Sequence, residues 1–314
     1  MIDVIIPAYN AHNTIEQTLT SIAFQSIVDK LNVYIINDCG KDYKEIVEYY
    51  SMFMNIEELK LSKNSGPGQA RQHGIDNSNS EYIIFIDSDD VFTDSLAIET
   101  LYNELSNSNN DIIVSTFLEE LENTFIPKHT QYVWMHGKMY KRSYLTKNNI
   151  RFNNTYTNED CGFNQLCYMC GANYLELNRT TYIWRNNYES ITRTRTEESK
   201  IKYLKMFVYN MIWAIEESLK RNYNENRVSE IIYATIVASY HYYLQNEEIF
   251  KKEKLLEQLS ILIKYHTEHP ITKEEKLSII KNQLYTETSG PDLYKVYNPS
   301  ITLEGFINIL KEGV

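Results

Sequence analysis

The sequence predicts an α/β protein: a mostly parallel sheet with helices on both faces, followed by an all-helical C-terminal region. Short apolar runs alternate with amphipathic helical stretches through the N-terminal half, which is typical of strand–helix units. From about residue 196 the apolar residues instead recur at helical spacing. A length of 314 residues suits two domains. We therefore expect one domain over residues 1–195 and a second over residues 196–314.

Five short apolar runs predict the strands of the first domain, at residues 3–6, 33–36, 59–61, 82–86 and 111–115. Pro7 is expected to close the first of these strands. Helices are expected between the strands. Capping-box pairs introduce two of them, Asn13 with Glu16 and Asp42 with Glu45.

The C-terminal region carries apolar stripes at helical spacing within residues 204–219, 228–243 and 255–263. Turn-forming residues at 222–226 and 269–270 separate these expected helices. The stripes indicate that each helix buries an apolar face. They leave open what that face packs against.

The charge balance excludes some classes of function. Lys plus Arg is 31 and Asp plus Glu is 42, which gives a net charge of −11. Non-specific binding to nucleic acid or to an anionic membrane depends on excess basic charge. The longest uncharged apolar stretch, residues 231–244, is too short to span a bilayer.

Neither the N-terminus nor the cysteines indicate export. No basic segment precedes the first apolar run, so we expect no targeting signal. Four cysteines in a chain of this size fit a reducing compartment, and we expect a cytoplasmic protein. Cys167 and Cys170 form a lone CxxC, which favours two half-buried helix cysteines over a zinc site, because structural zinc needs four ligands.

The residues Asp87-Ser88-Asp89-Asp90 follow directly on an apolar run and are the strongest chemical signal. Two carboxylates at positions i and i+2 can converge on one hard divalent cation that keeps open positions for phosphate oxygens. An EF-hand calcium loop is excluded, because Val91 takes the third ligand position and no glycine follows. Acidic residues also end strands at ordinary turns, so the motif alone leaves both interpretations open.

Four further motifs stand in order around these acids. They are residues 4–10, 37–42, 64–71 and 158–160. Together with residues 85–90, their order and spacing resembles the large family of GT-A-fold glycosyltransferases called family 2. The resemblance covers about residues 1–195. It implies a GT-A fold and the inverting transfer of a sugar from a nucleotide-diphosphate sugar, expected to be a UDP-sugar, to a hydroxyl acceptor.

The resemblance also implies roles for individual residues. Asp160 matches the acid that serves as catalytic base, with Glu159 beside it. Asp89, together with Asp87, is expected to hold Mn²⁺ or Mg²⁺ at the donor diphosphate. Cys39-Gly40 departs from the Gly-Ser pair that is commoner in the family, and this departure puts the identity of the donor's nucleobase in doubt. The donor is expected to contact Pro7, Ala8, Tyr9, Asn10, Asp38, Arg71, Asp87, Ser88, Arg185 and Ser190.

These residue types suit that chemistry. A carboxylate within reach of the acceptor hydroxyl can take its proton as the hydroxyl attacks. A cation neutralises the charge of the leaving diphosphate without a proton. One base and one displacement invert the anomeric centre, so no second carboxylate nucleophile is required.

Each of these residues also has a structural interpretation. Asp38 could cap a helix, and Arg71 could be exposed on its helix. Glu159 and Asp160 could cap the helix that follows, where the local dipole would hold a carboxylate ionised. His136 could meet the acceptor or a phosphate, or it could be packed as a structural residue.

The acceptor stays open at this point. Two groups of basic residues are interpreted either as solvated surface with counter-charge for the diphosphate, or as a site for a phosphate-bearing acceptor. Such an acceptor could be a wall polymer, a glycolipid, a protein glycan or a modified nucleic acid. The two groups are Lys138, Lys141, Arg142, Lys147 and Arg151, and Arg179, Arg185, Arg193 and Arg195.

The helical region has three possible roles: it could pack on the first domain, receive the acceptor, or pair subunits into a homo-oligomer. Two other functions compete with sugar transfer. Residues 85–91 also resemble the first motif of haloacid-dehalogenase-type phosphatases, an apolar strand that ends in DxD. A non-catalytic relative that only binds a nucleotide sugar is the second.

Overall fold

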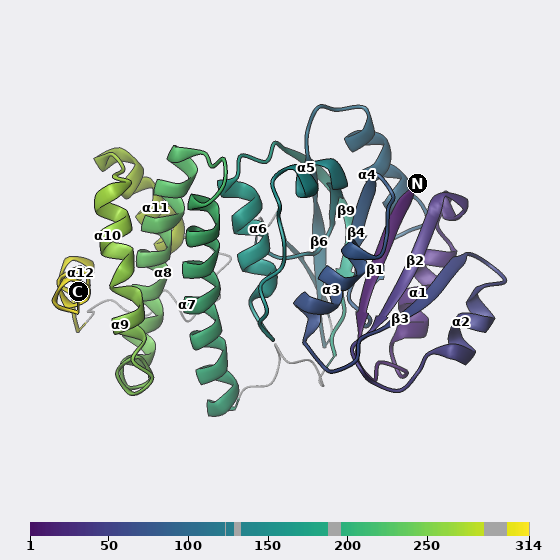
Figure 1. Cartoon of the computed structure of the whole chain (residues 1–314), viewed down its shortest axis with the longest axis horizontal. Helices are drawn as coiled ribbons and strands as arrows, with labels where there is room; N and C mark the ends of the chain where they lie inside the picture. The colour runs from purple at the N-terminus through teal and green to yellow at the C-terminus, as the bar shows by residue number, and fades with distance from the viewer. Residues whose placement is uncertain (123, 129–132, 188–195, 286–299, 314) are drawn as a thin grey trace. The chain divides into compact units, whose positions relative to one another are not determined.

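The computed structural model describes residues 1–122, 124–128, 133–187, 196–285 and 300–313. The chain forms two compact units, one of Met1–Cys167 with Ala172–Thr194 and one of Tyr168–Gly171 with Arg195–Val314. Strands and helices alternate in the first unit, drawn purple to teal in Figure 1, whereas the described residues of the second are helical (Figure 1). The expected α/β part and all-helical part are thus confirmed.

One mixed sheet forms the centre of the first unit. Its described strands follow the order β3-β2-β1-β4-β8-β6-β9-β5, and β7 pairs with β6. The strands β3, β2, β1 and β4 are parallel to one another. The strands are β1 (Ile2–Ala8), β2 (Leu31–Asn37), β3 (Asn55–Lys60), β4 (Tyr82–Phe85), β5 (Val91–Phe92), β6 (Ile112–Leu121), β7 (Thr124–Lys128), β8 (Lys138–Lys141) and β9 (Tyr174–Trp184).

Beyond β4 the sheet departs from the mostly parallel arrangement that we expected. β8 is antiparallel to both β4 and β6, while β9 is parallel to β6. β5 is antiparallel to β9, and β7 is antiparallel to β6. Antiparallel neighbours need no helical crossover, and the chain here returns through short strands.

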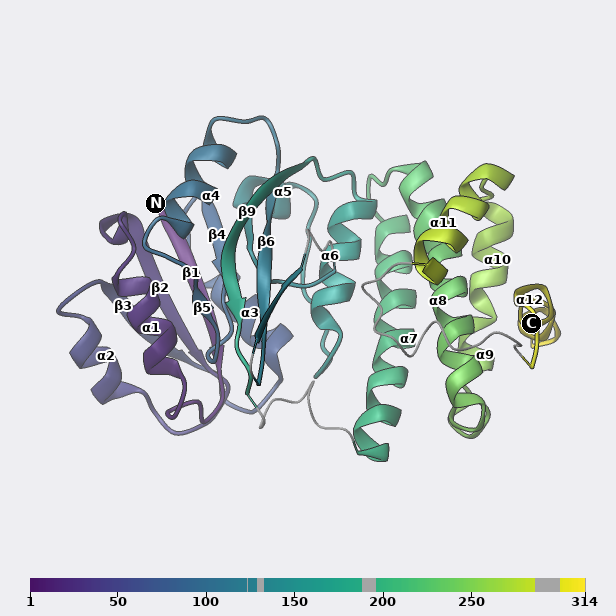
Figure 2. The ribbon, with the colours of Figure 1, turned by 180° about the vertical axis from the view of Figure 1, so that it is seen from behind.

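Helices cover both faces of this sheet (Figures 1 and 2). Val4 and Ile6 lie in one core cluster with the buried residues of α1 and α4. Ile5 points to the opposite face, toward α3, where a Cβ on Gly74 would lie 2.5 Å from its Cγ2. The helices of this unit are α1 (Ile15–Ala23), α2 (Lys44–Tyr50), α3 (Pro67–Asp76), α4 (Ala97–Ser106), α5 (Arg142–Lys147) and α6 (Glu159–Met169), whose last residues belong to the second unit.

The expectation that Pro7 closes the first strand is wrong, because β1 continues to Ala8. Ile5 O accepts the N–H of Ile86, so the backbone polar groups of residues 5 and 7 point to the same neighbour, β4. β4 ends at Phe85. Pro7 therefore lies beyond the end of that partner strand, so its missing N–H costs no hydrogen bond of the sheet and the strand tolerates the proline.

Neither expected capping box forms. α1 begins after Thr14 and α2 after Tyr43, and neither residue makes a side-chain cap. Both helices start one residue later than expected. Glu16 and Glu45 are therefore second rather than third in their helices, out of place for the reciprocal bond.

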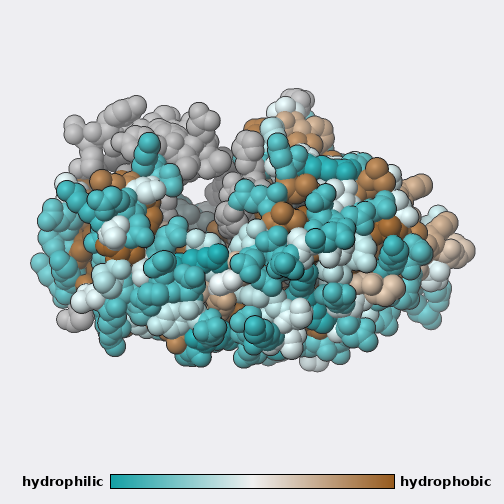
Figure 3. All heavy atoms as spheres, turned by 90° about the horizontal axis from the view of Figure 1, so that it is seen from above, coloured by the Kyte–Doolittle hydropathy of each residue, from teal (hydrophilic) through white to brown (hydrophobic). Residues whose placement is uncertain are grey.

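The second unit contains the helices α7 (Glu197–Leu219), α8 (Glu225–Lys252), α9 (Leu255–Leu259), α10 (Ile261–Glu268), α11 (Lys273–Tyr285) and α12 (Leu303–Glu312). The expected stripes are the buried faces of these helices, for example Leu204, Val208 and Ile215 in α7. Among the described residues, no helix combines the length and apolar character that crossing a membrane requires. Hydrophilic residues dominate the face drawn in Figure 3, and hydrophobic ones gather there in smaller groups.

Candidate active site

The carboxyl ends of β1, β2 and β4 bring three of the sequence motifs to one edge of the sheet, because these strands are parallel. Asp38 N donates to Ala8 O over 2.8 Å, which joins the first two motifs. After β4 the chain turns back, and Asp90 N donates to Asp87 O over 3.1 Å. We call residues 87–90 the acid turn.

Arg71 connects the acid turn to the helix that carries the expected base. Its Nη2 donates to Asp87 Oδ1 over 2.5 Å, and its Nη1 donates to Glu159 Oε1 over 2.6 Å. The side chains of Arg71 and Glu159 are only 5% and 6% exposed. Burial opposes the charge on Arg71, but Asp87, Glu159 and Asp160 together raise its pKa above the ordinary value. Arg71 is a buried counter-ion, so its interpretation as an exposed helix residue is wrong.

The same contact affects Asp87, which is partly exposed in the acid turn. Burial would raise the pKa of this carboxyl, but Arg71, through its positive charge and its hydrogen bond, lowers the pKa below the ordinary value. Asp87 is therefore ionised at neutral pH. It offers a negative charge at the edge of the sheet.

Asp160 lies in the first turn of α6 and is half-buried. Asn158, at φ +58°, turns the chain into this helix, and Asp160 Oδ1 accepts the N–H of Cys161 over 2.7 Å. Burial, and then the charge of Glu159, raise the pKa of Asp160 to about 7 although Arg71 lowers it. The sequence suggested that the helix N-terminus would hold Asp160 ionised, whereas burial raises its pKa above the ordinary value. A carboxylate with this pKa suits proton abstraction near neutral pH.

Gly68 allows Glu159 to reach Arg71. A Cβ on Gly68 would lie 2.6 Å from Glu159 Cγ and 2.9 Å from its Cβ, so any larger residue would push the first turns of α3 and α6 apart. The Glu159 carboxylate is directed to Arg71 and is buried. The role in catalysis expected of Glu159 stays a prediction.

Asp38 holds the loop that leads into α3. Its Oδ1 accepts the N–H of Ser65 over 2.7 Å, and its Oδ2 accepts the N–H of Gly66 over 2.8 Å. Asp38 is 4% exposed. The structural interpretation of Asp38 therefore holds in part, because it caps the residues just before the helix. A contact between Asp38 and a nucleobase stays a prediction.

The unusual Cys39-Gly40 pair lies in a tight loop beside Asp38. Cys39 has φ +62°, a left-handed conformation that favours glycine, and its side chain is exposed. Asn10, at φ +52°, accepts the N–H of Lys41 over 3.0 Å through its Oδ1. A Cβ on Gly40 would lie 2.8 Å from that same Oδ1, so Gly40 is needed for this close approach.

Those of the other expected donor contacts that the structure describes lie around the same edge. Pro7 and Ala8 are buried at the end of β1, Tyr9 is 55% exposed, and Ser88 is half-buried in the acid turn. Arg185 follows β9, and its Nε donates to Glu120 Oε2 over 2.7 Å. Ser190 lies outside the described residues. The roles of these positions stay predictions.

Asp89 and Asp90 differ in their surroundings. Asp89 is half-buried, and its Oδ2 accepts the amide N–H of Asn187 over 2.8 Å. Asp90 is fully buried, and it accepts hydrogen bonds from the Tyr182 hydroxyl over 2.5 Å and from the Arg185 N–H over 2.8 Å. Burial, and then the charges of Asp87 and Asp89, raise the pKa of Asp90 well above its ordinary value.

Among the described residues, one group of three side chains could hold a metal ion: Asp87, Asp90 and His136, whose ligand atoms lie within 4.8 Å of one another. His136 is stacked on Tyr182 with ring centroids 4.9 Å apart, and its Nε2 lies 3.9 Å from Asp90 Oδ2. Burial lowers the pKa of His136 to about 4, so the imidazole is neutral. Cys167 and Cys170 are free thiols and both are buried.

The two basic groups are not one charged surface. Lys138 is 1% exposed, its Nζ donates to Trp134 O, and burial lowers its pKa to about 7. Arg142 is paired with the buried Asp3 over 2.8 Å. In the second group Arg185 is paired with Glu120, while Arg193 and Arg195 lie outside the described residues. Lys138 and Arg142 thus serve internal contacts, whereas Lys147 and Arg151 are exposed.

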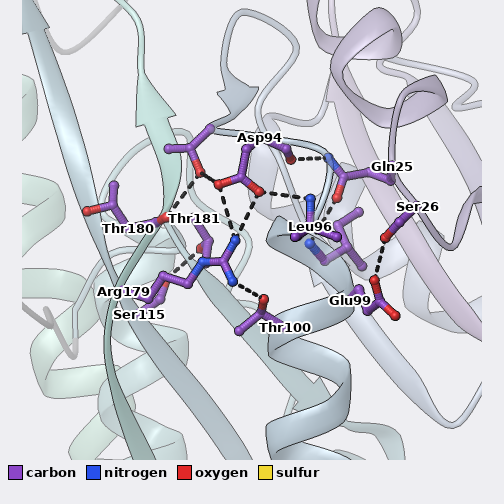
Figure 4. Close-up of polar contacts among 12 residues, drawn as sticks. Gln25, Ser26, Asp94, Leu96, Glu99, Thr100, Ser115, Arg179, Thr180 and Thr181 are labelled. Atoms are coloured by element: carbon purple, nitrogen blue, oxygen red, sulfur yellow. Dashed lines mark hydrogen bonds and ion pairs between the residues drawn. The ribbon is translucent and has the colours of Figure 1, made fainter.

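A polar network holds the segment just after the acid turn (Figure 4). The carboxylate of Asp94 accepts from Arg179 over 3.1 and 3.2 Å and from the N–H of Leu96 over 2.8 Å. Gln25, in the segment after α1, donates to Asp94 O over 2.7 Å and accepts the N–H of Ile98 over 3.0 Å. The network joins β9, α4 and the segment after α1. The acid turn therefore leads into a fixed segment.

One buried arginine, Arg71, joins acids from two of the motifs, Asp87 and Glu159, and this arrangement fits a nucleotide-sugar transferase of the GT-A type. Residues 3–163 match the family described as glycosyl transferase family 2. This chain belongs to glycosyl transferase family 2, and it is a glycosyltransferase.

Two relatives illustrate the likeness. The chain is 28% identical over 219 residues to the poly(ribitol-phosphate) beta-N-acetylglucosaminyltransferase TarP of Staphylococcus aureus, covering 63% of this chain and 67% of TarP. It is 26% identical over 231 residues to the glycosyltransferase GlyA of Streptococcus pneumoniae, covering 63% of this chain but only 32% of GlyA. The match thus extends over two thirds of one relative and a third of the other.

Solved structures confirm the expected fold. Residues 1–349 of S. aureus TarS, solved in complex with UDP-GlcNAc, align with a TM-score of 0.70 at 17% identity, covering 90% of this chain and 91% of that one. The mannosyltransferase PcManGT of Pyrobaculum calidifontis, solved with GDP-Man and Mn²⁺, aligns with a TM-score of 0.55 at 12% identity, covering 98% of this chain and 85% of that one.

The sequence analysis missed several residues of this site. Nothing in the spacing indicated that Asn187, nearly 100 residues beyond the acid turn, would bond to it. Glu120, which holds Arg185, was also missed. These contacts depend on how β9 pairs with β6. That pairing contains a register shift, which the sequence does not reveal.

Proposed function

We propose that this chain transfers a sugar from a UDP-sugar to a hydroxyl acceptor with inversion of the anomeric centre, in the presence of Mn²⁺ or Mg²⁺. The observation that carries the proposal is the double contact of Arg71 with Asp87 and Glu159. It ties the acid turn, which suits a cation and a diphosphate, to the helix turn that presents Asp160. The sugar donor and the catalytic base can then lie at one place.

In this proposal Asp160 is the general base. Its carboxylate is half-buried and its pKa is raised to about 7, so it can hold a proton from the acceptor hydroxyl at neutral pH. Glu159 is turned toward Arg71 and leaves Asp160 as the freer carboxylate of the pair. A single base and a single displacement lead to inversion.

The cation would be held by the carboxylates of Asp89 and Asp87, which are both partly exposed and whose oxygens are ligands that a hard cation prefers. When bound, such a cation neutralises the diphosphate charge of the leaving group. The edge residues Tyr9, Asn10 and Asp38 would line the nucleotide.

Two comparisons support a specific donor and acceptor. The TarS structure was solved with UDP-GlcNAc, and TarP is a poly(ribitol-phosphate) beta-N-acetylglucosaminyltransferase. We therefore infer UDP-N-acetylglucosamine as the first donor to test and a polyol-phosphate wall polymer as the first acceptor class. Lys138, Arg142 and Arg185 are already engaged in contacts within the chain, so phosphate contacts of that polymer would have to come from other residues.

A donor panel tests this proposal. The purified chain is incubated with UDP-, GDP- and dTDP-sugars, with Mn²⁺ or with EDTA, and both the thermal shift and the released nucleoside diphosphate are measured. We expect stabilisation by UDP-sugars with Mn²⁺, and release of UDP that increases with poly(ribitol phosphate). Binding without release under every condition would instead favour a non-catalytic relative. A phosphatase is already disfavoured, because the family match includes the acid turn.

A further inference from the structure

Asp90 is bonded differently from the other two carboxylates of the acid turn. It is fully buried, whereas Asp87 and Asp89 are partly exposed. One carboxylate oxygen of Asp90 accepts the Tyr182 hydroxyl over 2.5 Å, and the other accepts the Arg185 N–H over 2.8 Å. Its carbonyl oxygen accepts the Thr18 hydroxyl over 2.7 Å. Asp90 therefore joins the acid turn to β9 and to α1.

The Tyr182 hydroxyl reaches both ends of the acid turn. Besides donating to Asp90, it accepts the N–H of Asp87 over 3.3 Å. Tyr182 is 1% exposed, and its ring is stacked on His136 and packed edge-on against Phe92. The ring is therefore held on two sides, and the position of the hydroxyl is fixed.

We infer that Tyr182 and Asp90 are positioning residues of the donor site, and that Asp90 is not a ligand of the cation. The Tyr182 hydroxyl fixes the acid turn against β9, so that Asp87 and Asp89 present their carboxylates together. The inference rests on the proposed function, since it concerns the cation and the donor of that reaction. It opposes the simpler interpretation that Asp87, Asp90 and His136 form the cation site because their ligand atoms lie within 4.8 Å.

The physical reason is that both carboxylate oxygens of Asp90 already accept hydrogen bonds. A carboxylate whose two oxygens already accept a hydroxyl and a backbone N–H would have to break a short hydrogen bond to coordinate a cation. A ligand must also be held within a few tenths of an ångström of its productive position by surrounding contacts. Tyr182 supplies such a contact at both ends of the turn. Removing its hydroxyl frees the turn without removing a carboxylate.

Three variants separate positioning from ligation. Tyr182→Phe removes only the hydroxyl, Asp90→Asn keeps the shape and one of the two acceptor oxygens, and Asp89→Asn removes an expected ligand. Tyr144→Phe is the control, because Tyr144 is also buried, at 7% exposed, and its hydroxyl donates to Cys167 O over 2.8 Å. For each variant, Mn²⁺ binding with UDP present is measured by electron paramagnetic resonance of free Mn²⁺. Thermal stability, and kcat and KM with UDP-N-acetylglucosamine, are measured beside it.

We expect Tyr182→Phe to weaken Mn²⁺ binding about tenfold, while its melting temperature falls no further than that of Tyr144→Phe, which keeps wild-type Mn²⁺ binding. Asp90→Asn, as a change to a positioning residue, should weaken Mn²⁺ binding no more than about tenfold, whereas Asp89→Asn should lose about a hundredfold. The inference is overturned if Tyr182→Phe leaves Mn²⁺ binding and KM unchanged, or if Asp90→Asn loses as much as Asp89→Asn. A wild-type chain that binds neither Mn²⁺ nor UDP would instead remove the proposed function, and this inference with it.

Discussion

Arg71 and Glu159 lie 88 positions apart in the chain, and their side chains form an ion pair of 2.6 Å that is almost completely buried. Arg71 also contacts Asp87 over 2.5 Å, so one guanidinium connects α3, the acid turn and the start of α6. A buried charge that loses its partner is costly, at about 3–5 kcal/mol, whereas exposed pairs contribute about 0–1 kcal/mol.

The first prediction concerns this ion pair. Arg71→Gln should lower the free energy of unfolding by about 3 kcal/mol, because Glu159 is left buried without its partner. Arg151→Gln is the control, since Arg151 is 49% exposed and paired with Asp76, which is 42% exposed, and we expect a change below about 1 kcal/mol. Urea unfolding of both variants measures the difference. Equal losses in the two variants would show that the Arg71 pair does not stabilise the fold as proposed.

The second prediction concerns Gly68, which lies in α3. Helix propensity alone predicts that Gly68→Ala stabilises the chain by about 1 kcal/mol. The close approach of Glu159, at 2.6 Å from the added Cβ, predicts the opposite sign, a loss of about 1–3 kcal/mol. Thermal or urea unfolding decides between them. A more stable variant would mean that the first turns of α3 and α6 do not touch in solution.

The third prediction concerns the left-handed backbone at Cys39. With φ at +62°, Cys39→Gly should raise the free energy of unfolding by up to about 1 kcal/mol, because glycine adopts this conformation without strain. Cys39→Ala is the matched control: it removes the thiol, keeps a Cβ and should gain nothing. The two variants are compared by urea unfolding. A glycine variant that is less stable than the alanine variant would contradict the strain at this position.

The fourth prediction concerns pH. The pKa of Asp160 is raised to about 7, and a base works only when it is ionised. The rate of sugar transfer should therefore increase as the pH rises toward 7, level off above it, and fall about tenfold for each pH unit well below it. The measurement is kcat/KM between about pH 5.5 and about pH 8.5, with donor binding followed separately at each pH. A flat profile, with donor binding also unchanged, would exclude Asp160 as the titrating base.

Much of this architecture could be predicted from the sequence, because its strands carry their own signal. The apolar runs at residues 3–6, 33–36 and 82–86 are fully buried strands, and buried parallel strands are continuous apolar runs. The order of polar motifs after these strands then indicates the edge of the sheet where they meet. The α/β class, the all-helical second part and the family follow from these local patterns.

The contacts of the site could not be predicted in the same way, because they depend on distant register. The pairing of Arg71 with Glu159 requires that α3 and α6 touch at Gly68, and no local pattern encodes that approach. Lys138 looked like part of a basic surface, but it lies in β8, a strand that the apolar pattern did not indicate, and it is buried. The raised pKa of Asp160 also depends on tertiary burial, which no local pattern encodes.

The most direct test of the central claim compares the wild type with Asp160→Asn in the transfer of N-acetylglucosamine from UDP-N-acetylglucosamine, with Mn²⁺ and poly(ribitol phosphate) present. The account predicts that the variant binds the donor as tightly as the wild type but transfers about 10²–10⁴-fold more slowly, because only the base has been removed. A variant with the full transfer rate would contradict the account.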